Sequence, residues 1–308
     1  MAGLNKIFEK KTASKPLTLA VFTLIIALLF FLLLVIKSKP PTLSMKSILL
    51  FFLLNSANLI FLDYTFTKLE LTKRQFFFIP LTFVSNLYIF IFTNDFFFIL
   101  IQLVFIGIFY MLLKNQNTEN ITMVIFHLTA VIIVIYFFNA SGLSLIIPFI
   151  LILILFNINP TKNLLTLFVS SILVFFFIYS VSFFASMYIP SIKIYNINHL
   201  IEGFRFNPTV KTESIVMTTC FLFGLYELPK LQRRASLFKK SLFSFFIIFS
   251  SLDILAYTFI DKYTFGMSIP VIIYLYSNFI YFRKKTLVRE ILFTGYLALT
   301  LVLIYNKL

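Results

Sequence analysis

The residues best suited to chemistry lie in the longest polar segment of the chain, residues 188–213. Within it His199, Glu202 and Arg205 recur every three residues, so a helix would turn all three toward one side. A histidine can act as a general base that a carboxylate orients, and an arginine can bind a phosphate. We therefore take these three residues as the candidate catalytic set, suited to a diphosphate-bearing substrate.

The same segment carries apolar residues at helical spacing. Ile197, Leu200, Ile201 and Phe204 stand at i, i+3, i+4 and i+7, which predicts a short amphipathic helix lying on a membrane surface. His199, Glu202 and Arg205 then belong to its polar face. Because every interfacial helix needs a polar face, a purely structural role explains the same residues.

A second polar set lies in the middle of an apolar run. Asn55, Ser56 and Asn58 stand there, and the spacing of three places Asn55 and Asn58 on one helical face. Amides at that depth usually hydrogen-bond a neighbouring helix, although a polar cavity for a lipid headgroup or a solute is the alternative. We predict helix packing, with partners among the following residues: Ser85, Asn86, Ser180, Ser182, Thr218, Thr219 and Asn278.

A third set is basic. Residues 229–242 carry Lys230, Arg233, Arg234, Lys239 and Lys240 beside an apolar run. Such clusters on the cytoplasmic side of a span attract anionic headgroups without any further specificity. This segment is therefore predicted to be a docking surface for anionic lipid or for a partner protein.

The elements that position these sets follow from composition. Of 308 residues, 60% are hydrophobic and only 12% are charged, with a mean hydropathy of +1.00. Apolar runs of near-spanning length predict about eleven transmembrane helices in an all-α, polytopic bundle that forms one domain from residue 1 to 308. The runs are 17–36, 47–62, 76–92, 96–113, 121–138, 143–156, 164–187, 214–228, 243–260, 267–281 and 290–305.

Orientation follows from the basic residues, because Lys and Arg are retained in short cytoplasmic loops. With the N-terminus in the cytoplasm, 18 of the 26 Lys and Arg residues lie on the inner side and 8 on the outer side. The C-terminus is then outside, residues 188–213 form an outer loop, and residues 229–242 form a cytoplasmic loop. The run 17–36 is expected to be an uncleaved first span.

Several functional classes are disfavoured. The net charge is +15, and the basic residues lie in short loops between apolar runs. This position favours a role in keeping those loops on the cytoplasmic side of the membrane over binding to nucleic acid. Within the runs His127 and Asp253 are isolated ionisable groups, fewer than a proton-coupled pump would need. Phosphate-binding glycine loops, hydrolase motifs and metal-ligand motifs are absent from the sequence, so neither a metal nor a cofactor is expected.

The opening of the chain resembles a known group of proteins. Ile7 and Phe8, followed by lysine-rich residues to Lys15, Pro16 and Leu17 and then by the first apolar run, are similar to the start of an uncharacterised family of polytopic inner-membrane proteins in Bacteroidota. The length and the phenylalanine-rich spans resemble that family too. The resemblance implies a bacterial inner membrane and carries over no catalytic residue.

The outer loop and the number of spans resemble, in architecture only, the O-antigen polymerase type of membrane glycosyltransferase. Those enzymes usually have several loop arginines, whereas this loop has Arg205 alone. The leading hypothesis is a non-catalytic accessory or scaffold subunit that packs against other inner-membrane proteins. One alternative is a polymerase-like glycosyltransferase acting on polyprenyl-linked sugar at the outer face, through His199, Glu202 and Arg205. Another is a transporter or lipid flippase that uses Asn55 and Asn58.

Overall fold

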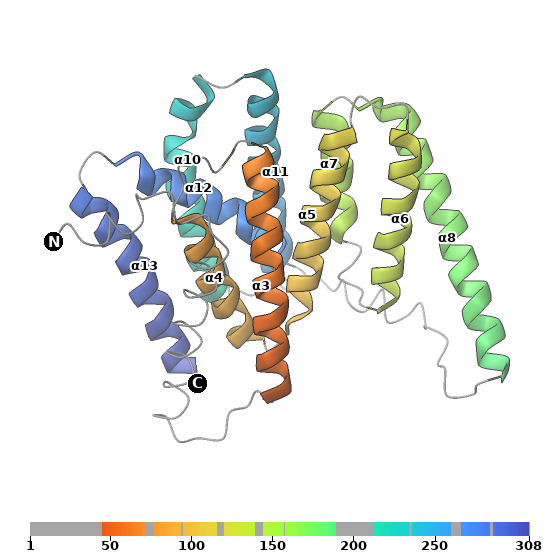
Figure 1. Ribbon diagram of the computed structural model, residues 1–308, viewed down its shortest axis with the longest axis horizontal. Coiled ribbons are helices and arrows are strands. Elements are labelled where there is room, and N and C mark those ends of the chain that lie inside the picture. Colours follow the sequence, from red (N-terminus) through yellow and green to blue (C-terminus); the bar gives the residue numbers. More distant parts are fainter. Residues whose placement is uncertain are drawn as a thin grey trace. The chain divides into compact units, whose positions relative to one another are not determined.

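The computed structural model describes residues 45–69, 71, 77–93, 95–115, 120–138, 144–156, 158–188, 212–233, 236–259, 266–283 and 286–307. Within these ranges all regular structure is helical (Figure 1). The helices are α3 (Met45–Lys68), α4 (Phe78–Thr93), α5 (Phe97–Asn115), α6 (Ile121–Phe138), α7 (Ile146–Leu155), α8 (Pro160–Tyr188), α10 (Thr212–Arg233), α11 (Leu237–Phe259), α12 (Ile269–Tyr281) and α13 (Thr286–Lys307).

Each apolar run between residues 47 and 305 coincides with one of these helices, whereas the run 17–36 lies outside the described residues. Pro80, Pro148 and Pro270 fall in the first turns of α4, α7 and α12. A proline is tolerated there because the first turn of a helix leaves its N–H groups unbonded. The prediction of an all-helical fold is therefore confirmed for the described part of the chain.

Among the described residues, five helical segments are long and apolar enough to cross a membrane. They are Lys46–Lys68, Phe97–Asn115, Pro160–Val181, Leu237–Phe259 and Leu287–Lys307. Four shorter apolar helices, α4, α6, α7 and α12, accompany them. These helices indicate a membrane-embedded protein, because a helix bonds its own backbone polar groups where lipid offers no partner.

The contacts divide the chain into two compact units. Unit 1 comprises Met1–Leu103, Thr212–Arg233 and Phe265–Leu308, and unit 2 comprises Val104–Lys211 and Arg234–Thr264. The sequence predicted one transmembrane domain over residues 1–308, and that grouping stays a prediction. Each unit is described below by itself.

Unit 1 is built around two short helices that are buried on nearly all sides. Every residue of α12 from Ile269 to Ile280 is buried, and α4 is buried over most of its length. α3, α12 and α13 pack against α4, while α10 and α13 also pack against α12. A predominantly apolar helix is typical of such an interior position. α4 and α12 are therefore the core of unit 1.

Unit 2 contains α6, α7, α8, α11 and the end of α5. α8 packs against α6 and α7, and α7 also packs against α11. Phenylalanines join α5 to α11: the ring centroids of Phe105 and Phe249 are 4.8 Å apart, and those of Phe109 and Phe245 are 5.5 Å apart. Such stacked pairs add to the free energy of area burial.

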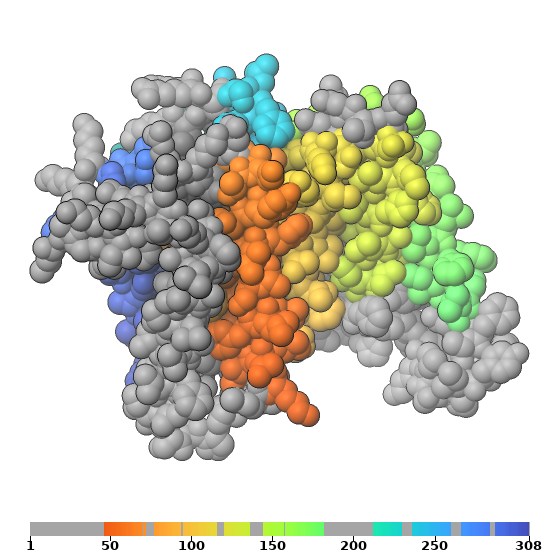
Figure 2. Space-filling view, in the orientation of Figure 1, coloured from red at the N-terminus to blue at the C-terminus, as the bar shows by residue number. Residues whose placement is uncertain are grey.

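Large apolar side chains also cover the outside of the units. Figure 2 shows α3 uncovered along much of its length, and there Leu49, Leu53 and Ile60 are more than half exposed. The spanning part of α8 is covered least, with 6% of it buried. Apolar surface on this scale needs lipid or another protein against it.

Candidate functional site

A cluster of four amide side chains lies inside unit 1. Asn55 and Asn58 come from α3, Asn86 from α4 and Gln102 from the first part of α5, and all four are fully buried. The spacing of three along α3 turns Asn55 and Asn58 toward the same neighbours. We call these four residues the amide cluster.

The amide cluster is linked by hydrogen bonds between helices. Asn86 Nδ2 donates to Asn55 Oδ1 at 2.8 Å and to Gln102 Oε1 at 3.0 Å, and Asn58 Nδ2 also donates to Gln102 Oε1. Gln102 Nε2 donates to the carbonyl oxygen of Gly266 at 2.7 Å and to Asn86 Oδ1 at 3.4 Å. The cluster thus ties α3, α4 and α5 to the segment that leads into α12.

Glycine is required at the backbone end of this network. Gly266 has φ +156°, and a Cβ atom there would lie 2.5 Å from the ring of Phe98. The conformation disfavours L side chains, and the ring leaves no space for one. The carbonyl group that accepts the hydrogen bond from Gln102 therefore belongs to a position that only glycine can occupy without strain.

The chemistry open to the cluster is limited by its composition. Neutral amides donate and accept hydrogen bonds, but they do not titrate and cannot serve as general acids or bases. Within the described residues, Asn55 Nδ2 and Asn58 Oδ1 have no hydrogen-bond partner. Most amide groups of the cluster thus form hydrogen bonds between helices, and only these two groups, one donor and one acceptor, form none.

A buried ion pair is the second polar feature of unit 1. Arg283, just after α12, forms a salt bridge with Glu227 of α10, whose side chain is 1% exposed against 26% for Arg283. The guanidinium carbon of Arg283 also lies 4.0 Å from the ring centroid of Phe279 and 5.5 Å from that of Tyr226. This arrangement joins α10 to the end of α12 by charge and by cation–π contact.

The outcome for the predicted polar set in α3 is mixed. Asn55 and Asn58 are brought together with Asn86, which confirms one of the predicted partners. Ser56 is half-buried and takes no part in these bonds. Ser85 instead bonds the hydroxyl group of Tyr296 at 2.6 Å, and Thr219 and Asn278 bond carbonyl groups of their own helices.

The other predicted sites lie partly or wholly beyond what the structure describes. His199, Glu202 and Arg205 lie outside the described residues, as does Arg234. The predicted loop at residues 229–242 is mostly helical: α10 continues to Arg233, and α11 begins at Leu237. Lys230 and Arg233 therefore belong to the end of α10, and Lys239 and Lys240 to the first turn of α11.

Two ionisable residues of the apolar runs, His127 and Asp253, belong to α6 and α11. His127 Nδ1 lies 2.7 Å from the carbonyl oxygen of Met123 in its own helix, which is a local structural bond. Asp253 is buried in α11. In the part of the chain that the structure describes, no group of three or more His, Cys, Asp or Glu side chains could hold a metal ion.

Sequence reasoning missed Gln102, Glu227 and Arg283. Gln102 is an amide inside an otherwise apolar run, the same signal that marked Asn55 and Asn58, and it could have been found. Glu227 and Arg283 stand at the ends of their runs, where charged residues are common. Their pairing joins residues 56 positions apart and needs the packing of α10 on α12.

Replacing Gln102 with leucine tests whether the cluster stabilises unit 1. The change leaves Asn58 Nδ2 without its acceptor, and we expect a loss of about 1–3 kcal/mol in unfolding free energy, the cost of an unbonded buried polar group. Thermal unfolding can be followed by reaction of Cys220, the only cysteine, which is buried in α10, with a thiol-reactive dye.

Two further variants control this test. Thr219→Val removes a hydroxyl group that bonds only within its own exposed helical turn, so it should leave stability nearly unchanged. Adding Asn58→Leu to Gln102→Leu removes both partners and should recover part of the loss. An unaltered unfolding temperature in Gln102→Leu would show that the cluster contributes nothing.

Five of the described helices are long and apolar enough to span a membrane, which indicates a multi-pass helical membrane protein. Comparison with protein-family models, with curated proteins and with solved structures finds no match for the chain. No known site is therefore carried over to these residues.

Proposed function

We propose that the protein is a non-catalytic accessory or scaffold subunit of a membrane complex in the bacterial inner membrane. The amide cluster is the observation that supports this most directly. Its members bond one another across α3, α4 and α5, so these buried polar side chains join helices inside unit 1. A scaffold needs such fixed helix packing, and neutral amides offer no acid, base or nucleophile.

The exposed apolar faces support the second half of the proposal. On α13, Leu287, Ile291, Leu299, Val302 and Tyr305 are all at least 44% exposed and fall within one side of the helix. Gly295 lies on the same side, and a Cβ atom added there would meet none of the described residues within 4 Å. Small residues on a lipid-facing side allow another helix to approach closely.

The proposal retains the topology expected from the sequence. It has about eleven spans, with the N-terminus in the cytoplasm and the C-terminus outside. The unequal distribution of Lys and Arg supports this orientation. The basic residues at the end of α10 and the start of α11 would then face the cytoplasm and anionic lipid.

Purification from the native membrane tests the proposal. The tagged protein is extracted in mild detergent, and the proteins that accompany it are identified by mass spectrometry. We expect a stoichiometric set of other inner-membrane proteins, because the exposed apolar faces favour helix–helix contact. A protein that purifies alone, or together with a lipid-linked sugar, would contradict the proposal and favour the outer-loop enzyme.

Gly295→Leu offers a matched variant for the same experiment. Its Cβ atom meets none of the described residues within 4 Å, and Gly295 stands on the exposed side of α13, so the change is made on the outward surface. Loss of the partner set with unchanged thermal stability would assign the contact to α13. Retention of the partner set would assign it to another face.

A further inference from the structure

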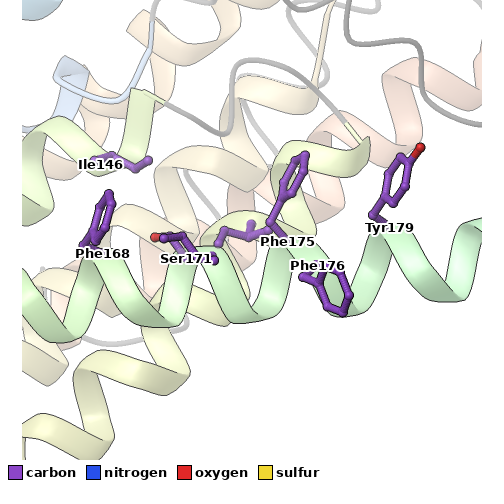
Figure 3. Close-up of a pocket in the computed structure, with 8 residues that line it drawn as sticks. Ile146, Phe168, Ser171, Phe175, Phe176 and Tyr179 are labelled. Atoms are coloured by element: carbon purple, nitrogen blue, oxygen red, sulfur yellow. The ribbon is translucent and has the colours of Figure 1, made fainter.

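An apolar groove runs along α8 within unit 2. It has a volume of about 470 Å³ and is lined by Ile133 of α6, Ile146 of α7 and a row of α8 side chains: Phe168, Ser171, Ile172, Phe175, Phe176 and Tyr179. Figure 3 shows Phe168, Phe175 and Tyr179 projecting from the same side of α8, with Ile146 near Phe168.

The groove follows from the unequal lengths of two neighbouring helices. The 10 residues of α7 rise about 15 Å, whereas the 29 residues of α8 rise about 43 Å. α8 therefore continues beyond the first residue of α7, Ile146, and its aromatic rings there have no α7 side chains opposite them. The hydroxyl group of Ser171 bonds the carbonyl oxygen of Leu167 at 2.7 Å, so the lining is suited to hydrocarbon.

Basic residues at one end of unit 2 indicate which class of lipid would place a chain in the groove. Lys114 ends α5, Lys162 begins α8, and Lys239 and Lys240 begin α11. In the view of Figure 1 these three helix ends all lie at the upper end of unit 2. Asp253, near the middle of α11, is the one carboxylate in the described residues of unit 2. This end is therefore complementary to an anionic headgroup.

The distance along α8 fits one lipid leaflet. From Lys162 to Phe176 the helix rises about 21 Å, and half of a bilayer, headgroups included, is about 20–22 Å thick. Lys162 is exposed, and among the described residues no carboxylate forms an ion pair with it. We propose that the groove binds one acyl chain of an anionic glycerophospholipid whose phosphate group contacts Lys162.

The proposal can be tested with a fluorescent reporter because the chain contains no tryptophan. Phe176 and Phe177 are adjacent and similarly exposed, at 70% and 66%, but only Phe176 lines the groove. Phe176→Trp and Phe177→Trp are placed separately in nanodiscs of zwitterionic lipid, with increasing fractions of phosphatidylglycerol that carries brominated chains. Bromine quenches tryptophan emission on contact.

We expect quenching of Phe176→Trp to saturate at a low fraction of the brominated lipid, and quenching of Phe177→Trp to rise in proportion to that fraction. Adding Lys162→Gln to Phe176→Trp should raise the half-saturating fraction about fivefold, the effect of one lysine near an anionic surface. Lys114→Gln, which removes a lysine from α5 at the same end, should change it much less.

Three results would overturn the proposal. The first is equal, proportional quenching at both positions, which indicates lipid without a preferred place. The second is the same half-saturation for a brominated zwitterionic lipid, which removes the role of charge. The third is quenching at Phe177→Trp but not at Phe176→Trp, which indicates that another protein or a second copy of the chain covers the groove. Unfolding temperatures close to that of the unaltered chain establish that the variants are folded.

Discussion

Replacing Arg283 with glutamine is expected to destabilise the protein by about 3–5 kcal/mol, the cost of breaking a buried ion pair by removing one charge. The Glu227 side chain is 1% exposed, so its carboxylate has little access to water in the folded protein. The contacts of Arg283 with the rings of Phe279 and Tyr226 are lost as well. Thermal unfolding, followed by labelling of buried Cys220 on α10, measures the effect.

The reciprocal variant should cost less. In Glu227→Gln the remaining guanidinium group is 26% exposed and can be partly hydrated, so we expect a loss of about 1–2 kcal/mol. The double variant should cost less than the two single changes added together, because both remove the same interaction. An equal or larger loss for Glu227→Gln would contradict the asymmetry.

Arg289→Gln provides the control for both variants. Arg289 donates from Nε to the carbonyl oxygen of Arg283 at 2.6 Å and lies 5.6 Å from the ring centroid of Tyr281. Its loss removes an arginine from the same part of unit 1 and leaves the salt bridge between Glu227 and Arg283 in place. We expect a loss near 1 kcal/mol, so a loss as large as that of Arg283→Gln would point to a general effect of removing arginine.

The helices of this protein could be predicted because each membrane span is a continuous run of apolar residues in the sequence. The run 121–138 coincides with α6, and the run 267–281 contains all of α12. The runs did not reveal that α12 is buried on every side while α8 is mostly uncovered. Both helices are predominantly apolar, and only their neighbours distinguish them.

The candidate site could be predicted in part for the same reason. Asn55 and Asn58 are conspicuous amides within one apolar run, and their spacing predicts a shared face. That they meet Asn86 and Gln102, and that Gln102 reaches the carbonyl group of Gly266, depends on which helices are adjacent. A backbone acceptor 164 residues away leaves no signal in side-chain composition.

The prediction about buried charge was wrong for one residue, Glu227. The scarcity of ionisable residues in the apolar runs predicted spans nearly free of buried charge, yet Glu227 is buried and ion-paired. It stands near the end of its run, where a charged side chain is expected to reach the headgroup region. The packing of α10 on α12 buries it instead, and Gly224 lies at a close part of that contact, against Leu275.

Gly224→Ala tests this contact and should destabilise the protein by about 1–3 kcal/mol, the usual cost of overpacking. The added Cβ atom would lie 2.6 Å from Leu275 Cβ and 2.9 Å from the carbonyl carbon of Leu275, so α10 would have to move away from α12. The Cβ atom of Gly295→Ala, in α13, meets none of the described residues within 4 Å, so this variant should gain up to about 1 kcal/mol from helix propensity. Both changes share that propensity gain, so the difference between their unfolding temperatures measures the α10–α12 contact. Equal shifts in the two variants would show that α10 and α12 tolerate the extra methyl group, and that the close approach at Gly224 does not hold Glu227 against Arg283.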